Sequence, residues 1–560
     1  MQADCRGIII YSSSEGSFAG LFCFGREQLK KILISAVCAL LIASACGRKR
    51  VGGFVRDPDY LKAAMSADAK RLIPMLATDS ASGDISGLIF QGLTKYDKNI
   101  KIVGDLAKGW DISKDGLVIT FHLHKHVKWQ DGAPFTAADV LFTYKVLRDP
   151  NTATPYSDDL GPVEKVEAPD PYTVKVTYKK PFAPALEAWG MGIIPEHLLK
   201  GKNINDDPFN RHPVGTNFFK FSRWITGNRI VLDAYTGYFR GRPHIDKYVS
   251  RIIPDQATQF LELKTGGIDM MDLTPLQYAR ETDTPSIKRR FKKLRYPAFA
   301  YDYLGYNLTN PLFKDKRVRQ ALSYAVDQKS IIQGVLLGLG TPCTGPFPPE
   351  SWAYNKDVKG YPYNPEKAKE MLKEAGWTPG PDGVLTKDGR RFEFTILVNQ
   401  SNKQREMAAE IIQQDLAKVG VRVKITALEW QALLHDFIDK KRFEALIMGW
   451  ALGRDPDVYD IWDSSKTKEG EFNFISYKNP EVDKLLVEGR ETFDFRKRQE
   501  IYRRIHAIIS DDAACTFLYV PDALPIISRR FKGVKKAPIG IMYNLREWRV
   551  PKNHGEWYTQ

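Results

Sequence analysis

The chain has 560 residues, of which 43% are hydrophobic and 27% are charged, a composition typical of a globular protein with two or three domains. Its formal net charge is +15, yet Lys and Arg are interspersed with Asp and Glu along most of the chain. Because a nucleic-acid binder gathers its basic residues on one patch or arm, we expect no nucleic-acid partner. The dense basic run at residues 288–295 mixes charged and apolar residues as a half-exposed strand does.

The N-terminal region has the pattern of an export signal. Arg26, Lys30 and Lys31 precede the apolar run 32–42, which is too short to span a bilayer comfortably, and small residues follow it. A cysteine directly after them resembles a lipoprotein signal, so we predict a signal peptide over residues 1–46 with a lipoprotein-type cleavage site and lipidation of Cys46. Cleavage by the general signal peptidase is the alternative. The mature chain is expected in the periplasm or at the cell surface, anchored to the membrane through lipidated Cys46.

Two cysteines outside the signal region, Cys343 and Cys515, lie in a chain expected in an oxidising compartment, which permits disulfides. A disulfide needs Cα atoms within about 7 Å of each other, and the sequence does not establish that distance. Two separate buried thiols are the favoured interpretation, and a disulfide stays open as the alternative.

The first predicted elements of the mature chain alternate between helix and strand. A small-residue loop over 71–83 leads into a helix over 84–93, and alternating apolar and polar residues predict a strand over 118–124. After a turn, the Thr136 hydroxyl and the Asp139 carboxylate can cap a helix that runs through Leu147.

Farther along, the chain shows hairpin and βαβ patterns. Residues 224–232 predict a hairpin around the turn 226–228. A strand over 391–398, a helix over 405–419 and a strand over 421–428 form a βαβ unit, which indicates an α/β lobe. Two further helices are expected at 318–328 and 365–375.

Common catalytic signatures are missing from the mature chain. It has no GxSxG elbow, no GxxxxGK[ST] phosphate loop, no HExxH and no CxxC pair, so we expect no enzyme activity and no cofactor. His122, His124 and His126 would share one face of a strand and could form a metal site. Their alternation with apolar residues favours the polar face of a half-buried strand instead, with no metal bound.

Three consecutive segments carry a family pattern: residues 104–116 (GDLAKGWDISKDG), 120–123 (TFHL) and 127–140 (VKWQDGAPFTAADV). They resemble the signature of the family 5 extracellular solute-binding proteins, the oligopeptide- and dipeptide-binding components of ABC importers. The resemblance continues in order through residues 212–216, 238–243, 313–322, 363–368, 449–457 and 531–533, and so covers nearly the whole mature chain. In this signature His122 is a usual residue, whereas His124 and His126 stand where the family often has Arg and Gly.

The resemblance implies an α/β, two-lobed periplasmic-binding-protein-like fold with an extra subdomain and a ligand cleft between the lobes. The N-terminal lobe is expected over residues 54–300, including a signature subdomain at about 95–185. The second lobe would span 303–518, and a C-terminal tail over 519–560 would return to the first lobe.

The function implied by the resemblance is that of a substrate-binding protein of an ABC importer. It would capture peptides, with oligopeptides as the favoured class, by closing its lobes. It would then deliver them as a monomer to a permease in the cytoplasmic membrane. Two alternatives stay open: a transport protein that binds metal or a chelate through His122, His124 and His126, and a secreted hydrolase with an unrecognised site.

The resemblance also suggests ligand-binding residues. Asp79, Ser80 and Ser82 correspond to a ligand-facing loop of the first lobe, and the second lobe contributes facing residues, namely Asn399, Arg405, Trp450 and Asp455. Trp450 offers a flat apolar wall, and Arg405 could pair with a ligand carboxylate. Each has a structural alternative: Trp450 could lie in the core beneath the cleft, and Arg405 could simply open its helix.

The charged clamp of the family's dipeptide binders is not carried over. Those proteins place a carboxylate two or three residues after the Gly-Trp pair, where this chain has Leu452 and Gly453. They also place an Arg near the position of Leu397 or Val398. Longer peptides, held mainly through backbone hydrogen bonds, are therefore favoured over dipeptides.

Overall fold

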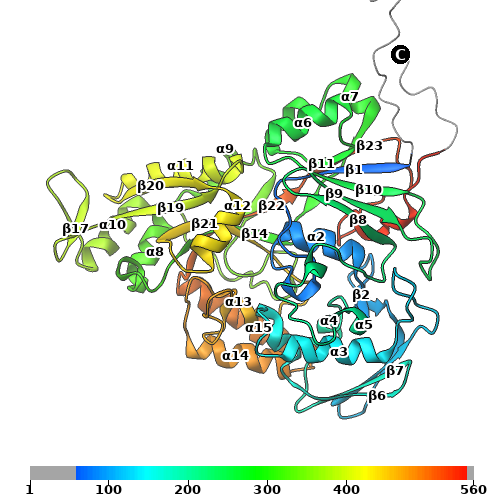
Figure 1. Ribbon diagram of the computed structural model, residues 1–560. Helices are drawn as coiled ribbons and strands as arrows, with labels where there is room; N and C mark the ends of the chain where they lie inside the picture. Colours follow the sequence, from blue (N-terminus) through cyan, green and yellow to red (C-terminus); the bar gives the residue numbers. More distant parts are fainter. Residues whose placement is uncertain (1–58, 552–560) are drawn as a thin grey trace, which may run out of the picture. The chain divides into compact units, whose positions relative to one another are not determined.

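The first lobe is built on a mixed sheet. The computed structural model describes residues 59–551, so the predicted signal peptide and Cys46 lie outside the described residues (Figure 1). Within that range a seven-stranded sheet has the order β12-β23-β11-β1-β10-β9-β8. Its strands are β12 (Phe291–Lys293), β23 (Pro525–Ser528), β11 (Met270–Asp272), β1 (Tyr60–Met65), β10 (Lys247–Ile252), β9 (Arg229–Ala234) and β8 (Phe219–Ile225). Strand β1 runs parallel to β10 and β11, and the other pairs are antiparallel.

Helices and short turns complete this lobe. They are η1 (Pro74–Leu76), α2 (Ser80–Ile89), η3 (Pro208–Asn210), α6 (Gln256–Thr265), η4 (Gln277–Glu281), α7 (Pro285–Arg290) and η7 (Met542–Glu547). The C-terminal segment packs on the same core, because Leu545 and Trp548 belong to the hydrophobic cluster that also contains Leu61 of β1.

A subdomain is attached to the first lobe through a shared core. Its four-stranded antiparallel sheet consists of β4 (Ala107–Ile112), β5 (Val118–Leu123), β7 (Thr173–Tyr178) and β6 (Val163–Asp170). Around it lie the pair β2 (Thr94–Tyr96) and β3 (Ile102–Gly104), and the helices α3 (Ala137–Arg148), η2 (Pro155–Leu160), α4 (Ala185–Ala188) and α5 (Glu196–Leu199). Phe121 and Val174 belong to the cluster that contains Leu61, so the two sheets do not have separate cores.

The second lobe is an α/β layer structure. In the described part of the chain its sheet has the order β13-β22-β14-β21-β19-β20, with β15 paired to β22. These strands are β13 (Tyr296–Pro297), β22 (Cys515–Ala523), β14 (Ala300–Tyr306), β21 (Ala445–Ala451), β19 (Glu393–Asn399), β20 (Arg422–Leu428) and β15 (Gly340–Pro342). A small separate sheet contains β16 (Thr378–Pro379), β17 (Leu385–Lys387) and β18 (Arg390–Arg391).

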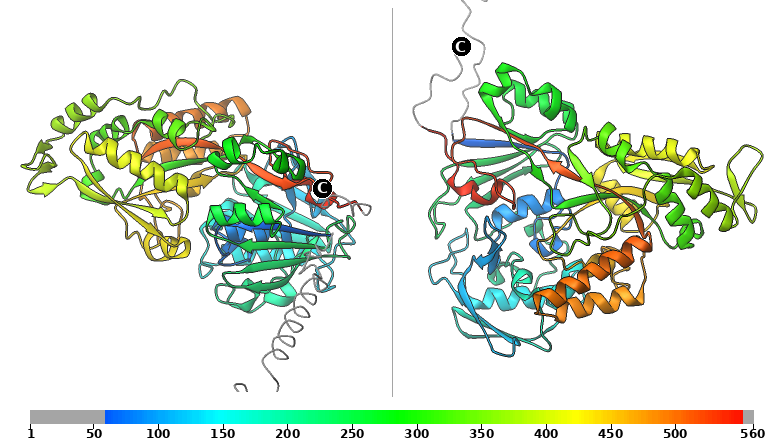
Figure 2. Two further views of the ribbon diagram at one scale, coloured as in Figure 1. Left: turned by 90° about the horizontal axis from the view of Figure 1, so that it is seen from above. Right: turned by 180° about the vertical axis from the view of Figure 1, so that it is seen from behind.

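Helices cover both faces of the second sheet. Along β21, Ala445 and Ile447 enter one hydrophobic cluster and Leu446 and Met448 enter another, as the period of two in a strand requires. The first cluster lies under η5 (Pro311–Phe313), α8 (Lys316–Ala325), α9 (Gln328–Gly334), α10 (Pro365–Glu374) and α11 (Lys403–Ala417). The second lies under α12 (Trp430–Ala432), η6 (Leu433–Ile438), α13 (Tyr459–Trp462), α14 (Pro480–Glu491) and α15 (Phe495–Asp511). Helices α14 and α15 lie side by side (Figure 2, right).

The chain crosses between the two lobes at two neighbouring places. One crossing joins β12 to β13, and the other joins β22 to β23 at Leu524. The crossings touch: the Leu294 amide donates to the Pro525 carbonyl (2.9 Å), and β13 pairs with the end of β22. Two adjacent crossings of this kind leave a common axis about which the lobes can rotate.

Most helices and strands predicted from nearby residues are present in the structure. Helix α3 begins with the predicted capping box of Thr136 and Asp139. Strands β8 and β9 form the predicted hairpin, and β19, α11 and β20 form the predicted βαβ unit with parallel strands. Cys343 and Cys515 are both free and buried, so the disulfide alternative is wrong.

Two boundary predictions are wrong. We expected a loop over 71–83, but α2 already begins at Ser80, because the Asp79 carboxylate caps it by accepting from the Ser82 amide. We expected a half-exposed strand at residues 288–295, but the strand β12 covers only Phe291–Lys293. Residues up to Arg290 belong to α7, which Thr284 caps and Pro285 opens. Among the described residues, no helix is both long and apolar enough to cross a membrane.

Candidate functional site

A cavity of about 1810 Å³ lies between the two lobes. On the first lobe it is lined at the carboxyl ends of the parallel strands β1, β10 and β11, by Met65, Pro254 and Asp272 among others. On the second lobe it is lined at the carboxyl ends of β19 and β21, by Asn399 and Trp450. Ligands of open α/β sheets generally bind outside the carboxyl ends of the strands, so both lobes present their usual binding edge to this cavity.

The first turn of α2 forms part of the first lobe's wall. The Asp79 carboxylate accepts from the Ser82 amide (3.1 Å) and from the Ser82 hydroxyl (2.6 Å). The Ser82 hydroxyl also accepts from the Lys70 amide (2.8 Å), and Ser82 is fully buried outside the cavity lining. Ser80 is exposed and lines the cavity, as does the largely buried Asp79. Of these three predicted residues, only Ser80 offers a side chain that the protein itself does not engage in this network.

Arg405 is held by the second lobe. Its Nη2 donates to Asp302 Oδ1 (2.7 Å) and its Nη1 donates to Asn399 Oδ1 (3.0 Å). Burial opposes the charge of Arg405, but Asp302 raises the pKa of the guanidinium above its usual value. All three residues line the cavity, and both side chains of the ion pair are mostly buried. The pair is therefore a charge-balanced part of the wall.

Trp450 and Asp455 follow each other along the second lobe's wall but have different surroundings. The Trp450 ring stacks on Phe474 (centroids 5.8 Å apart, 28° between planes) and meets Phe472 edge-on at 5.3 Å. Together the three rings make an aromatic surface on the cavity. Asp455 instead accepts two hydrogen bonds of 2.6 Å from Arg498. Burial raises the pKa of Asp455, and the bonds from Arg498 oppose that rise.

Glu187 of α4 links the lobes beside the cavity. Its carboxylate accepts from the Tyr96 hydroxyl (2.6 Å) in the first lobe and from the Asp455 amide (3.0 Å) in the second. Burial, and next the repulsion from Asp455, raises the pKa of Glu187 to about 7. Sequence reasoning missed this residue, because a lone Glu in a one-turn helix has no recognisable pattern.

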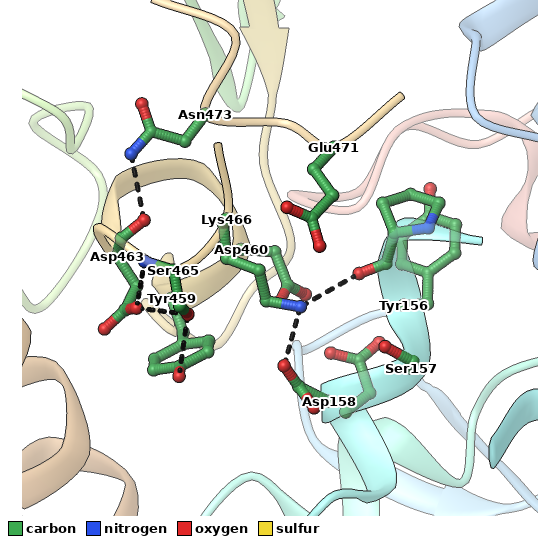
Figure 3. Close-up of polar contacts among 12 residues, drawn as sticks. Tyr156, Ser157, Asp158, Tyr459, Asp460, Asp463, Ser465, Lys466, Glu471 and Asn473 are labelled. Atoms are coloured by element: carbon green, nitrogen blue, oxygen red, sulfur yellow. Dashed lines mark hydrogen bonds and ion pairs between the residues drawn. The ribbon is translucent and has the colours of Figure 1, made fainter. Parts of the chain in front are cut away.

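Lys466 makes a second link between the lobes (Figure 3). Its side chain is 2% exposed, and its Nζ lies 2.8 Å from Asp158 Oδ2 of η2 and 3.2 Å from Asp460 Oδ1 of α13. Burial lowers the pKa of Lys466, but Asp460 and Asp158 outweigh it and raise that pKa above the usual value. A charged ammonium of the second lobe thus lies between carboxylates of both lobes.

Arg490 of α14 extends this contact. Its Nε donates to both carboxylate oxygens of Asp457 (2.8 and 2.9 Å), and its Nη2 lies 3.9 Å from Asp159 Oδ1 of the first lobe. Burial, and next the charge of Asp460, raises the pKa of Asp159 well above its usual range. We refer to Asp158, Asp159, Asp460, Lys466 and Arg490 as the interlobe ion cluster.

The three histidines of the predicted strand do not converge. His122 Nε2 lies 2.7 Å from Asp111 Oδ2, and the His124 ring packs against Phe239 (centroids 5.0 Å apart). His126 is exposed. Across residues 59–551, no group of three or more His, Cys, Asp or Glu side chains is placed to hold a metal ion.

Comparisons with a family model and with known proteins point to the same family. The model of the bacterial extracellular solute-binding proteins, family 5 Middle, matches residues 101–472. The oligopeptide-binding protein AppA of Bacillus subtilis is 37% identical over 491 residues, which cover 85% of this chain and 89% of that protein.

Solved structures agree. The structure of B. subtilis AppA in complex with a nonapeptide superposes with a TM-score of 0.83 at 34% identity, covering 88% of this chain and 99% of that one. The structure of NikZ from Campylobacter jejuni with Ni(L-His) superposes with a TM-score of 0.81 at 30% identity, covering 88% and 99%.

Proposed function

The chain belongs to the bacterial extracellular solute-binding proteins of family 5, and on this premise we propose that it captures oligopeptides between its lobes and passes them unchanged to an ABC permease. The observation that carries the proposal is the size of the interlobe cavity. Its volume of about 1810 Å³ exceeds the roughly 300–1,000 Å³ of a small-molecule pocket, so a dipeptide would leave much of it unfilled. The relative AppA was solved with a nonapeptide.

The lining suits a ligand whose sequence varies. Ser80 and the amide of Asn399 offer polar contacts, and Trp450 offers an apolar surface that accepts many side chains. We propose these three as ligand contacts. Asp79, Ser82, Arg405 and Asp455 would act indirectly, because their bonds within the protein hold the wall in shape.

Closure of the lobes would provide the driving force for capture. A ligand shifts the lobes toward the closed state only by the difference between its contacts in the closed and open forms. Contacts of Glu187 and of the interlobe ion cluster already join the lobes beside the cavity, so a bound peptide needs to supply only part of the closing free energy. Lipidation of Cys46 would keep the protein, as a monomer, near its permease.

The experiment is to purify the protein and identify by native mass spectrometry what leaves with it on mild denaturation. We expect peptides of several residues, and calorimetry with those peptides should give dissociation constants of micromolar or tighter, about −8 kcal/mol or better. Recovery of the same peptide masses after incubation would show that the ligand is not hydrolysed. No bound peptide, and no affinity better than about millimolar, would contradict the proposal.

A further inference from the structure

A basic surface lies at one end of the first lobe. Residues 284–295 and 523–546 each contain six Lys or Arg residues and no Asp or Glu. Over most of the remaining chain the two signs of charge are mixed, so these two segments account for most of the net charge of +15. None of their basic residues lines the interlobe cavity, so ligand binding there does not explain them.

The fold brings the two segments side by side. Strands β12 and β23 pair antiparallel, and directly beyond them the Arg529 amide donates to the Arg290 carbonyl (2.8 Å). The Arg290 guanidinium donates in turn to the Lys264 carbonyl of α6 (2.8 Å). Helices α6 and α7 and strand β23 accordingly lie at the same end of the first lobe (Figure 1).

The segment after β23 belongs to the same surface. The Lys292 ammonium of β12 donates to the Val534 carbonyl (3.5 Å), and Lys535 and Lys536 follow Val534 directly. Basic side chains from two helices, an edge strand and this C-terminal segment therefore gather together.

Some of these charges are matched by carboxylates of the protein. Lys293 Nζ lies 3.0 Å from Asp283 Oδ1, and Arg295 Nε lies 2.6 Å from Asp522 Oδ2. Six other basic side chains are exposed and form no ion pair among residues 59–551, namely Lys264, Arg289, Lys292, Arg529, Lys535 and Lys536. We refer to these six residues as the basic surface. Several exposed charges of one sign produce a potential that attracts a partner of the opposite sign.

Protection of the sheet edge explains only part of the basic surface. Strand β12 is the last strand of its sheet, and a charged edge strand resists pairing with another chain. This accounts for Lys292. It does not account for Arg289, which belongs to α7, or for Lys535 and Lys536, which lie outside any strand.

An exposed apolar side chain accompanies the cations on α6. Leu261 is 56% exposed and precedes Lys264 by three residues, so the two side chains share one face of the helix. A leucine beside basic side chains suits the headgroup region of a membrane, where cations meet phosphate groups and apolar side chains reach the acyl boundary.

The predicted lipid anchor lies within a short length of chain from the basic surface. Twelve residues, 47–58, separate Cys46 from the first described residue, and an extended chain of that length spans at most roughly 40 Å. Four of these residues are basic and one is acidic. The chain enters the first lobe at β1, where the Tyr60 carbonyl accepts from Arg530, the residue after Arg529. A protein tethered at Cys46 would therefore hold the basic surface close to the membrane.

We propose that the basic surface binds the anionic phospholipid headgroups of the membrane that carries the lipid anchor. The lipid chains hold the protein at the membrane, and the basic surface orients the first lobe against it. Headgroup phosphates accept charge-assisted hydrogen bonds from Lys and Arg, and each such charge near an anionic membrane adds to an attraction that salt screens. The inference does not depend on which solute the cavity binds.

The test is co-sedimentation of the mature chain, residues 47–560 prepared without lipid, with phospholipid vesicles. One kind of vesicle contains phosphatidylcholine alone, and the other contains phosphatidylcholine and phosphatidylglycerol in equal parts. We expect binding to the mixed vesicles at low salt and none to phosphatidylcholine alone. Raising the NaCl concentration from about 50 to about 300 mM should weaken that binding about tenfold or more.

Two quadruple variants locate the binding surface. The first neutralises four cations of the basic surface: Arg289→Gln, Lys292→Gln, Lys535→Gln and Lys536→Gln. The control neutralises four exposed lysines of the second lobe: Lys314→Gln, Lys373→Gln, Lys484→Gln and Lys497→Gln. Both variants change the net charge equally. The first should bind the mixed vesicles about tenfold or more weakly than wild type does, and the control should bind them as wild type does.

Calorimetry with a copurified peptide shows whether the variants are folded, because none of the eight substituted residues lines the cavity. Equal binding of the wild-type protein to both kinds of vesicle, or equal loss of binding in the two variants, would overturn the inference and leave peptide capture intact. Absence of wild-type binding to the mixed vesicles at low salt would also overturn it, and would favour an acidic protein as the partner of this surface.

Discussion

The interlobe ion cluster and the Asp84–Asp272 pair both place acidic side chains on the first lobe. They differ in whether a basic side chain of the protein lies beside the carboxylates. In the cluster, Asp158 lies 2.8 Å from the buried Lys466 of the second lobe. In the cavity, neither Asp84 nor Asp272 has a cation from either lobe within the described residues. A charge removed from water needs a partner, and where the lobes touch the other lobe provides it. Asp84 and Asp272 are exposed to the cavity, so water can hydrate them and no partner from the protein is required.

The largest effect on stability is expected from removing a charge of the interlobe ion cluster. Lys466→Met should lower the free energy of unfolding by about 3 kcal/mol, because it leaves Asp460 and Asp158 without their cation. Urea denaturation measures this. The control is Lys424→Met, which removes an exposed pair with Glu393 and should cost far less, because solvent screens that pair. Equal costs for the two variants would show that the cluster is not a matched buried contact.

The next effect concerns Glu187, a contact that links the lobes through a carboxyl group. Because its pKa in the folded protein is raised to about 7, it takes up a proton on folding, and its contribution to stability falls as the pH rises from about 4.5 to 7. Glu187→Gln should therefore gain about 1–2 kcal/mol relative to wild type between pH 5 and pH 8. Urea denaturation at both pH values tests this, with exposed Glu164→Gln as the control. A difference between Glu187→Gln and wild type that does not change with pH would contradict the assignment.

A smaller effect of opposite sign, a gain in stability, is expected from neutralising the Asp84–Asp272 pair. Asp84→Asn/Asp272→Asn removes two repelling charges, so at pH 7.5 the variant should unfold with a free energy higher by about 1 kcal/mol or less, since both side chains are exposed and screened. Thermal denaturation checks this. The gain should vanish below about pH 4, where the carboxyl groups are protonated in both folded and unfolded chains. A clear loss of stability at pH 7.5 would contradict the assigned repulsion between the two carboxylates.

The smallest effect is expected outside both regions. The triple substitution of His122, His124 and His126 by Ala should leave peptide affinity and nickel stoichiometry unchanged, because these side chains do not converge on one point. Calorimetry with peptide and with nickel chloride measures both. A nickel ion bound by wild type at one per chain, and lost in the variant, would instead support the metal-binding alternative.

Elements that depend on a local sequence pattern could be predicted from the sequence. The Thr136–Asp139 capping box and the βαβ unit of β19, α11 and β20 follow from spacing within a few residues or from periodicity. The start of α2 was misjudged because Ser-Ala-Ser-Gly reads as a loop, although Asp79 already provided the N-cap signal.

The contacts that distinguish the two regions could not be predicted in this way. Lys466 and Asp158 are far apart in the sequence, as are Asp84 and Asp272, so no local pattern records either pair. Arg405 shows the same limit: its helix position was predictable, but its engagement by Asp302 depends on a strand about one hundred residues earlier. The fold class followed from the family resemblance. The ion pairs of the cavity wall did not, because they join residues that are distant in the sequence.

The central claim is that the two lobes close around a peptide. Small-angle X-ray scattering during titration with a peptide that copurifies with the protein tests this claim most directly. We predict a radius of gyration that falls as peptide is added and levels off at the stoichiometry found by calorimetry. A radius that stays constant while calorimetry shows the peptide fully bound would contradict the account.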